Sequence, residues 1–150
     1  MSYQDFINDT KSSIVKHGRS ITLAPHSHAY TIGMAHANLP DVIITAPLRP
    51  ETMQVILNWV CDKLVDGTFK AGLNSEYIEN FNVFIAPCTE NMADFHAEYV
   101  AQADVYYQRA EMVSTKGFLQ VVFPDSNGNF PWDNEYGGMT QPLFVLKYQN

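Results

Sequence analysis

The chain has 150 residues, the usual size of one domain, and 46% of them are apolar while 17% are charged. This balance is typical of a folded domain and excludes an intrinsically disordered chain. The net charge of −7 and the scattered Lys and Arg residues exclude the basic stripe that binds duplex nucleic acid, although one Arg and a few backbone N–H groups could still hold a small anion.

The sequence carries no visible targeting or membrane signal. Its first ten residues have neither a basic start nor an apolar stretch, and no segment approaches the roughly 20 apolar residues that cross a bilayer. We therefore expect no signal peptide, no membrane partner and a cytoplasmic location. Cys61 and Cys88 lie in no metal-binding or redox spacing, so both are predicted to be small buried apolar residues.

The hydrophobic pattern predicts a single α+β domain over residues 1–150. Apolar residues at three- and four-residue steps predict helices, and β-branched or alternating runs predict strands. Because hairpins are mixed with crossovers, we expect one mixed, mostly antiparallel sheet with two or three helices packed on it. In chain order the predicted elements are a helix over 3–17 ended by Gly18, a hairpin of strands 19–23 and 29–34, a strand over 41–46, a helix from Arg49 closed by Gly67, a segment of loop and strand over 69–77, a strand over 82–86, a helix from its N-cap Thr89 to about Arg109, a strand over 118–123 and an edge strand over 143–146.

Two segments carry a resemblance to a known family. The first is Ala-Tyr-Thr-Ile-Gly-Met at 29–34, followed by Leu-Pro-Asp-Val-Ile-Ile at 39–44, and the second is Leu-Gln-Val-Val-Phe-Pro-Asp-Ser-Asn-Gly-Asn-Phe-Pro-Trp-Asp at 119–133. The sequence resembles the uncharacterised bacterial family called domain of unknown function 4262, whose members read F/A-Y-T-I-G-L, P-E-L-I-V and L-Q-V-V-W-P-D-x-x-G-x-F-P-W-E in this order. The departures are mild: Met34 for Leu, Asp41 for Glu, Phe123 for Trp and Asp133 for Glu. The resemblance implies a self-contained domain and brings no reaction and no catalytic residues.

The second segment holds candidate ligand-binding residues. Gln120 interrupts an apolar strand, where a buried amide needs hydrogen-bond partners, and Asp125 after Pro124 can hold a turn through its own backbone. An aromatic wall at Trp132, with the carboxylate of Asp133 beside it, is a common way to hold a small ligand. The alternative is structural: Trp132 fills the core and Asp125 only braces the turn.

Tyr30, the pair Tyr106-Tyr107 and Arg109 could complete such a pocket. Eight Tyr residues are more than a core easily satisfies, because each buried hydroxyl needs a partner, so some are expected to line a cleft. Arg109 is the natural anion-binding residue through its planar guanidinium group. Its alternative role is to complement the dipole at the C-terminal end of a helix.

Histidines provide a candidate metal site. His26 and His28 lie two residues apart and, on a strand, would point to one face and could share a Zn²⁺ ion. A third ligand would come from elsewhere in the chain: His36, His96, Asp125 or Asp133. No known zinc spacing is present, so the alternative is a polar hairpin turn with exposed imidazoles. His96, on the apolar stripe of its helix, is either a proton-transfer group beside a carboxylate or a core histidine bonded to a backbone carbonyl.

The sequence contains no phosphate-binding glycine loop, no nucleophile elbow and no other catalytic motif. The leading hypothesis is therefore a protein that binds a small polar ligand, with nucleotide-like molecules as one candidate class, without strong catalytic activity and without a cofactor. Such a domain could sequester a signalling nucleotide. The alternatives are a metal-assisted hydrolase that uses His26 and His28, or a protein–protein interaction or inhibitor module, so whether the protein is an enzyme stays open. The aromatic content also makes a homodimer a reasonable expectation.

Overall fold

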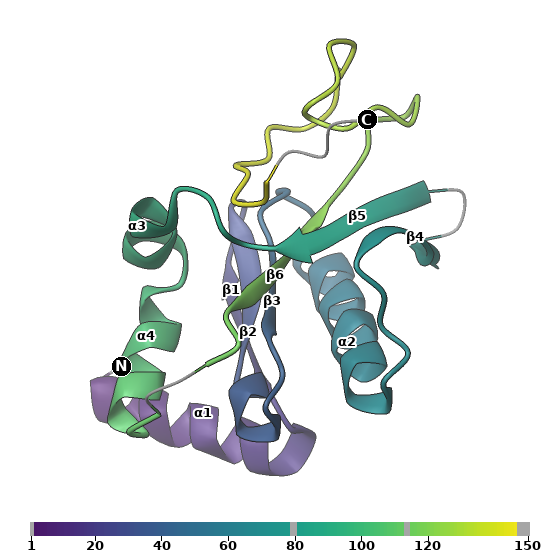
Figure 1. Cartoon of the computed structure of the whole chain (residues 1–150). Coiled ribbons are helices and arrows are strands. Elements are labelled where there is room, and N and C mark those ends of the chain that lie inside the picture. The colour runs from purple at the N-terminus through teal and green to yellow at the C-terminus, as the bar shows by residue number, and fades with distance from the viewer. Residues whose placement is uncertain (1, 79–80, 113–114, 147–150) are drawn as a thin grey trace.

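A six-stranded sheet forms the centre of the fold (Figure 1). The structure, a computed structural model, describes residues 2–78, 81–112 and 115–146. Its elements in chain order are α1 (Tyr3–His17), β1 (Ser20–Ala24), β2 (His28–Ile32), the 3₁₀ helix η1 (Met34–Ala37), β3 (Asp41–Ile44), α2 (Pro50–Asp66), β4 (Gly72–Ile78), β5 (Phe81–Pro87), α3 (Met92–Asp94), the π-helical turn η2 (Phe95–Tyr99), α4 (Ala101–Arg109) and β6 (Phe118–Val122).

The strand order is β1-β2-β3-β6-β5-β4. The central pair β3 and β6 is parallel, with Ile43 opposite Gln120, and the other neighbouring strands are antiparallel. The α+β class and the mixed, mostly antiparallel sheet predicted from the sequence are therefore confirmed. Among the described residues, no helix combines the length and apolar content needed to span a bilayer.

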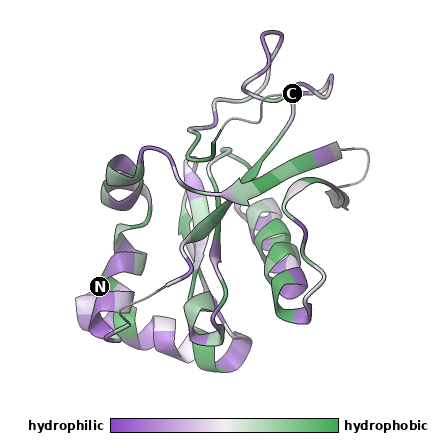
Figure 2. Ribbon diagram, viewed as in Figure 1, coloured by the Kyte–Doolittle hydropathy of each residue, from purple (hydrophilic) through white to green (hydrophobic). Residues whose placement is uncertain are grey.

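Helices cover both faces of the sheet (Figure 1). On one face, α2 packs its buried residues Val60 and Cys61 against Val42 and Val121 of the two central strands. On the other face, α1, η2 and α4 pack against Ile43 and its neighbours. Because successive side chains of a strand point to opposite faces, the continuous apolar run of β3 supplies both layers. Figure 2 shows the central strands in green and a mixture of green and purple on the helices, as expected for amphipathic helices on a core.

The two long helices begin and end where the sequence predicts. Ser2 caps α1 by accepting a hydrogen bond from the backbone of Asp5, and Gly18 ends the helix with a left-handed φ of 82°. In α2, Pro50 occupies the first turn and Gly67 ends the helix with φ 81°.

The third predicted helix is wrong in its detail. It does not start at an N-cap Thr89, because Thr89 donates its hydroxyl to the side chain of Glu90, and the first helical turn follows Asn91 at φ 54°. The helix is also not continuous: a π-helical turn is followed by Val100 with φ −125° and ψ 28°, where the helical conformation is lost before α4.

The predicted edge strand over 143–146 is likewise wrong, because it forms only an isolated bridge between Cys88 and Val145. Phe144 explains why: its N–H donates to the Gln120 side chain, and its carbonyl accepts from the N–H groups of Thr89 and Glu90. These partners leave the segment without a regular ladder.

The predicted strand over 29–34 ends early because the chain turns at Gly33. The φ of Gly33 is 113°, a conformation that L side chains rarely adopt, and η1 follows at once. An added Cβ would lie 2.6 Å from Cγ1 of Ile14 in α1. Gly33 is therefore required both by its backbone conformation and by the close approach of α1.

We expect Gly33→Ala to lower the free energy of unfolding by about 3 kcal/mol, from combined backbone strain and steric overlap. The matched control is Gly18→Ala, which has a similar positive φ of 82° but open space around the new Cβ; its expected cost is about 1 kcal/mol. Urea unfolding followed by tryptophan fluorescence measures both. Equal losses in the two variants would contradict the close packing of Ile14 on Gly33.

Candidate functional site

The break between η2 and α4 brings His96 and Asp104 together. Eight residues apart, they would be separated by about 12 Å along the axis of a continuous α-helix. In the structure, Nδ1 of His96 lies 3.0 Å from both carboxylate oxygens of Asp104. A π-helical turn inside a helix frequently marks a functional site. The irregular helix, which sequence periodicity could not predict, therefore creates a histidine–carboxylate pair.

This pair lines a cavity of about 420 Å³. Both side chains are 47% exposed, so a ligand can reach them. The walls also include Tyr107, Gln108 and Phe118, which supply aromatic surface and hydrogen-bonding groups. Because a carboxylate can only accept, Asp104 holds the proton on Nδ1 of His96, and Nε2 has no partner among the described residues. A neutral His96 thus presents Nε2 as an acceptor for a hydrogen bond or a proton from a ligand.

Behind the cavity, Tyr107 contacts a buried carboxyl group. Its hydroxyl donates to Oδ2 of Asp41, which is 1% exposed, and accepts the N–H of Gly33 at 2.7 Å. Oδ1 of Asp41 accepts from Thr31 Oγ1 at 2.8 Å and from the N–H of Met34 at 3.1 Å. Burial raises the pKa of Asp41 to about 7, against the hydrogen bonds from Tyr107, Thr31 and Met34, which lower it.

Sequence reasoning missed Asp41 and Tyr107 as a pair. Asp41 begins the predicted strand over 41–46, and an acidic residue at the start of an otherwise apolar run is itself a signal, since a buried carboxyl group needs partners. The partner could not be predicted, because Tyr107 lies on a distant helix. Thr31, Gly33 and Asp41 all belong to the first recognised segment, so that motif builds this buried network.

Gln120, fully buried, makes all its side-chain hydrogen bonds within the protein. Its amide nitrogen donates to Thr45 Oγ1 at 2.9 Å and to the carbonyl of Pro142 at 2.8 Å. Its amide oxygen accepts the N–H of Phe144 at 2.8 Å. The side chain thus fixes the C-terminal segment onto the sheet.

Asp125 organises the loop after β6. Its carboxylate accepts the N–H groups of Asn127, Asn129 and Gly137, each at 2.9 Å. These bonds, that of Gly137 foremost, hold the pKa of Asp125 below its usual value. Asp125 also lines two cavities at this end of the sheet, of about 420 and 500 Å³.

Trp132 and Asp133 lie in the same C-terminal segment. Trp132 stacks on Phe130 with ring centres 5.1 Å apart and meets the ring of Phe84 edge-on. Asp133 accepts the N–H of Phe130 at 2.8 Å. Asp133 thus holds the turn of this segment, and Trp132 packs against an apolar cluster beside β5 and β6.

The remaining predicted residues lie elsewhere. Tyr30 is buried in the core beneath α4, where its ring meets Phe118. Tyr106 is also buried, and its hydroxyl bonds to Nε2 of His36 at 2.7 Å. Arg109 is exposed at the end of α4. The predicted ligand-binding residues therefore occupy several separate places, and of the pair Tyr106-Tyr107 it is Tyr107 that lines the cavity beside His96.

The two histidines of the candidate metal site differ in their surroundings. His28 is buried and uses both ring nitrogens: Nε2 lies 2.9 Å from the Tyr99 carbonyl, to which it must donate, and Nδ1 lies 2.8 Å from Ser27 Oγ. Burial lowers the pKa of His28 and favours this neutral form. His26 is exposed in the turn with φ 65°. In the part of the chain that the structure describes, no group of three or more His, Cys, Asp and Glu side chains is placed to hold a metal ion.

We expect Asp41 to make stability depend on pH. The folded state binds its proton more tightly than the unfolded state, where the pKa is near 3.8, so its contribution is full below that pH and is lost as pH rises through about 7. Relative to Asp41→Asn, the wild type should lose about 3 kcal/mol of unfolding free energy between about pH 5 and 8.

Urea unfolding of both proteins across this range measures the difference. His28 acts in the opposite direction, because its lowered pKa adds stability as pH rises, but it is present in both proteins and cancels. If the unfolding free energy of the wild type instead rises relative to that of the variant as pH rises, the network stabilises the carboxylate.

We expect Gln120→Leu to loosen the C-terminal segment. The change leaves the buried N–H of Phe144 without its acceptor and should cost about 3 kcal/mol of unfolding free energy. Amide exchange at Phe144, followed by NMR, should accelerate with it. Gln102→Leu on the exposed side of α4 is the matched control and should change neither quantity. Unchanged exchange at Phe144 in Gln120→Leu would rule out this role.

Comparison with known proteins adds one identification. The family model described as "Domain of unknown function (DUF4262)" matches residues 11–137. No curated protein and no solved structure matches the chain. The matched region covers the sheet, all the helical segments except the first turns of α1, and the loop after β6. The chain therefore belongs to the DUF4262 family.

Proposed function

We propose that the protein binds a small, uncharged polar ligand with a planar ring in the cavity lined by His96, Asp104 and Tyr107. The observation that carries this proposal is the His96–Asp104 pair at the cavity wall. Asp104 fixes one ring nitrogen of His96 and leaves the other available, which is how proteins orient an imidazole toward a ligand.

The cavity walls favour this class of ligand. Tyr107, Phe118 and Met112 supply the apolar surface on which a planar ring can lie, and Gln108 adds an amide that both donates and accepts. The described lining residues include no Lys or Arg, the side chains that usually bind a phosphate group. Within the nucleotide-like class predicted from the sequence, a free base or nucleoside therefore fits better than a nucleotide.

We propose binding, and sequestration of such a molecule, ahead of turnover. A catalytic histidine is normally hydrogen-bonded to the nucleophile that it activates. No described residue makes such a bond to Nε2 of His96. The homodimer and the cytoplasmic location stay predictions from the sequence.

Thermal-shift screening of bases, nucleosides and nucleotides, followed by calorimetric titration of the hits, tests the proposal. Bases or nucleosides should raise the Tm more than the corresponding nucleotides do. His96→Ala and Asp104→Asn should each weaken the binding of a hit about tenfold or more, since each removes or misorients a hydrogen-bonding group. Both side chains are half exposed, so both variants should fold.

The matched control is His26→Asn, which removes an exposed histidine from a turn and suits its positive φ. It should bind as the wild type does. The proposal fails if no compound shifts the Tm of protein shown to be folded by circular dichroism, or if His96→Ala binds a hit with unchanged affinity. Consumption of the compound by the wild type but not by His96→Ala would show instead that His96 acts in catalysis.

A further inference from the structure

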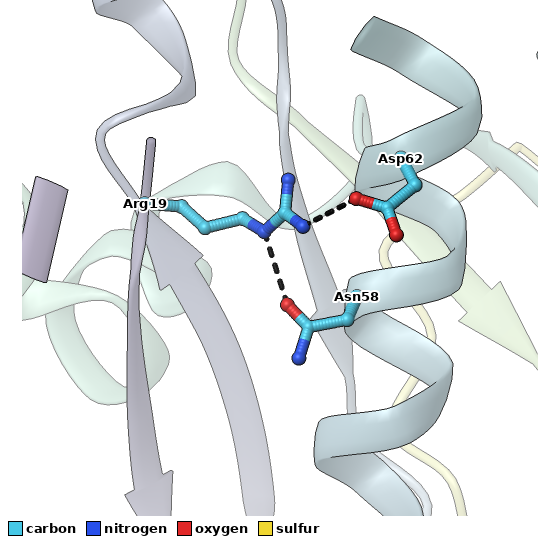
Figure 3. A network of polar contacts seen from close by, with 3 residues as sticks. All are labelled: Arg19, Asn58 and Asp62. Atoms are coloured by element: carbon cyan, nitrogen blue, oxygen red, sulfur yellow. Dashed lines mark hydrogen bonds and ion pairs between the residues drawn. The ribbon is translucent and has the colours of Figure 1, made fainter. Parts of the chain in front are cut away.

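A second cleft, of about 560 Å³, lies between α1, β1 and α2. Its central group is Arg19, which directly follows the glycine that ends α1 and has a side chain only 12% exposed. The Nε–H of Arg19 donates to Oδ1 of Asn58 at 3.0 Å, and Nη2 donates to Oδ1 of Asp62 at 2.5 Å (Figure 3). Two side chains one turn apart on α2 therefore fix the plane of the guanidinium group.

The guanidinium group still has donors to offer. It carries five N–H groups, and Asn58 and Asp62 take two of them. Figure 3 shows the third nitrogen, Nη1, pointing away from both partners. Donors on a largely buried side chain are expected to be satisfied, and a carboxylate matches their fork geometry. The hydroxyls of Ser13 and Ser20 and the imidazole of His17 line the same cleft.

Asp62 gives the cleft its second charge. Its side chain is 66% exposed, and only Oδ1 contacts Arg19, so Oδ2 has no partner among the described residues. The cleft thus presents a fixed positive group and an accessible negative group side by side. A simple anion would be repelled by the carboxylate of Asp62, and a simple cation would be repelled by the guanidinium group of Arg19. A molecule that carries both charges on neighbouring atoms interacts favourably with both.

We propose that this cleft binds a small zwitterion of the α-amino-acid type, with its carboxylate on the free N–H groups of Arg19 and its ammonium group on Asp62. This site is separate from the His96 cavity, and the inference does not depend on the proposed function. Charge-assisted hydrogen bonds at both ends orient the ligand. The hydroxyls of Ser13 and Ser20 and the imidazole of His17 would then contact the side chain of the bound amino acid.

Calorimetric or NMR titration of the full chain with the individual α-amino acids tests the inference. The best amino acid is compared with its deaminated acid and with its decarboxylated amine. We expect the amino acid to bind at least tenfold more tightly than either, because each analogue loses one charge-assisted interaction. Binding that is equally strong for the deaminated acid would overturn the role of Asp62.

Asp62→Asn is the decisive variant. The amide oxygen can still accept from Arg19, and the exposed position favours a normal fold. This change should lower the affinity for the amino acid about tenfold or more, and it should leave the affinity for the deaminated acid unchanged or raise it. The control is Glu51→Gln, which removes the same charge from the exposed start of α2. It should change the affinity for neither compound.

His96→Ala should bind the amino acid as the wild type does, so failure at one site is distinguishable from failure at the other. The inference is wrong if no amino acid binds the folded wild type at about 10 mM, or if Asp62→Asn and the wild type bind equally.

Discussion

The hydrogen bond from Tyr107 to Asp41 connects the sheet to the helices that carry the candidate site. Asp41 is the first residue of the central strand β3, Tyr107 lies in the last turn of α4, and the same hydroxyl also accepts the N–H of Gly33. Inside a protein core such a carboxyl group is tolerated only when its partners surround it, so the geometry of three elements is set at one point. Together with the packing of α4 on the core, this contact positions Asp104 opposite His96.

The sequence predicted the regular parts of the fold well, for physical reasons. The stripe on α2 and the continuous apolar run of β3 are periodic signals that arise from burial, and Gly18 and Gly67 end their helices with the left-handed conformation that glycine favours. The irregular parts carried no such signal. The π-helical turn and Val100 interrupt a segment whose side chains still fit helical spacing, because packing on the sheet decides where the break falls.

The same distinction applies to the candidate sites. Asp125 and Gln120 were singled out because polar residues do not suit a plain core strand, and both indeed make several hydrogen bonds in the structure. Their partners, such as Phe144 and Gly137, lie in segments without periodicity. The sequence therefore could not show whether these side chains bond to the protein itself or to a ligand. His96 is a candidate from the sequence, but its partner Asp104 comes into contact only through the break in the helix, and the Arg19 cleft depends on tertiary proximity; no short motif records either.

The parallel pair β3 and β6 has a consequence for how the chain folds. β3 lies at the centre of the sheet, yet the strand that pairs with it comes from near the end of the sequence, after α2, the β4–β5 hairpin and α4. Closing so long a loop costs chain entropy before any central contact is made, which slows folding. During synthesis, the edge of β3 that pairs with β6 stays unpaired until almost the whole chain has left the ribosome. In that interval β2 pairs with one edge of β3 and α2 covers one face of it, while the other edge is open and could pair with a second nascent chain.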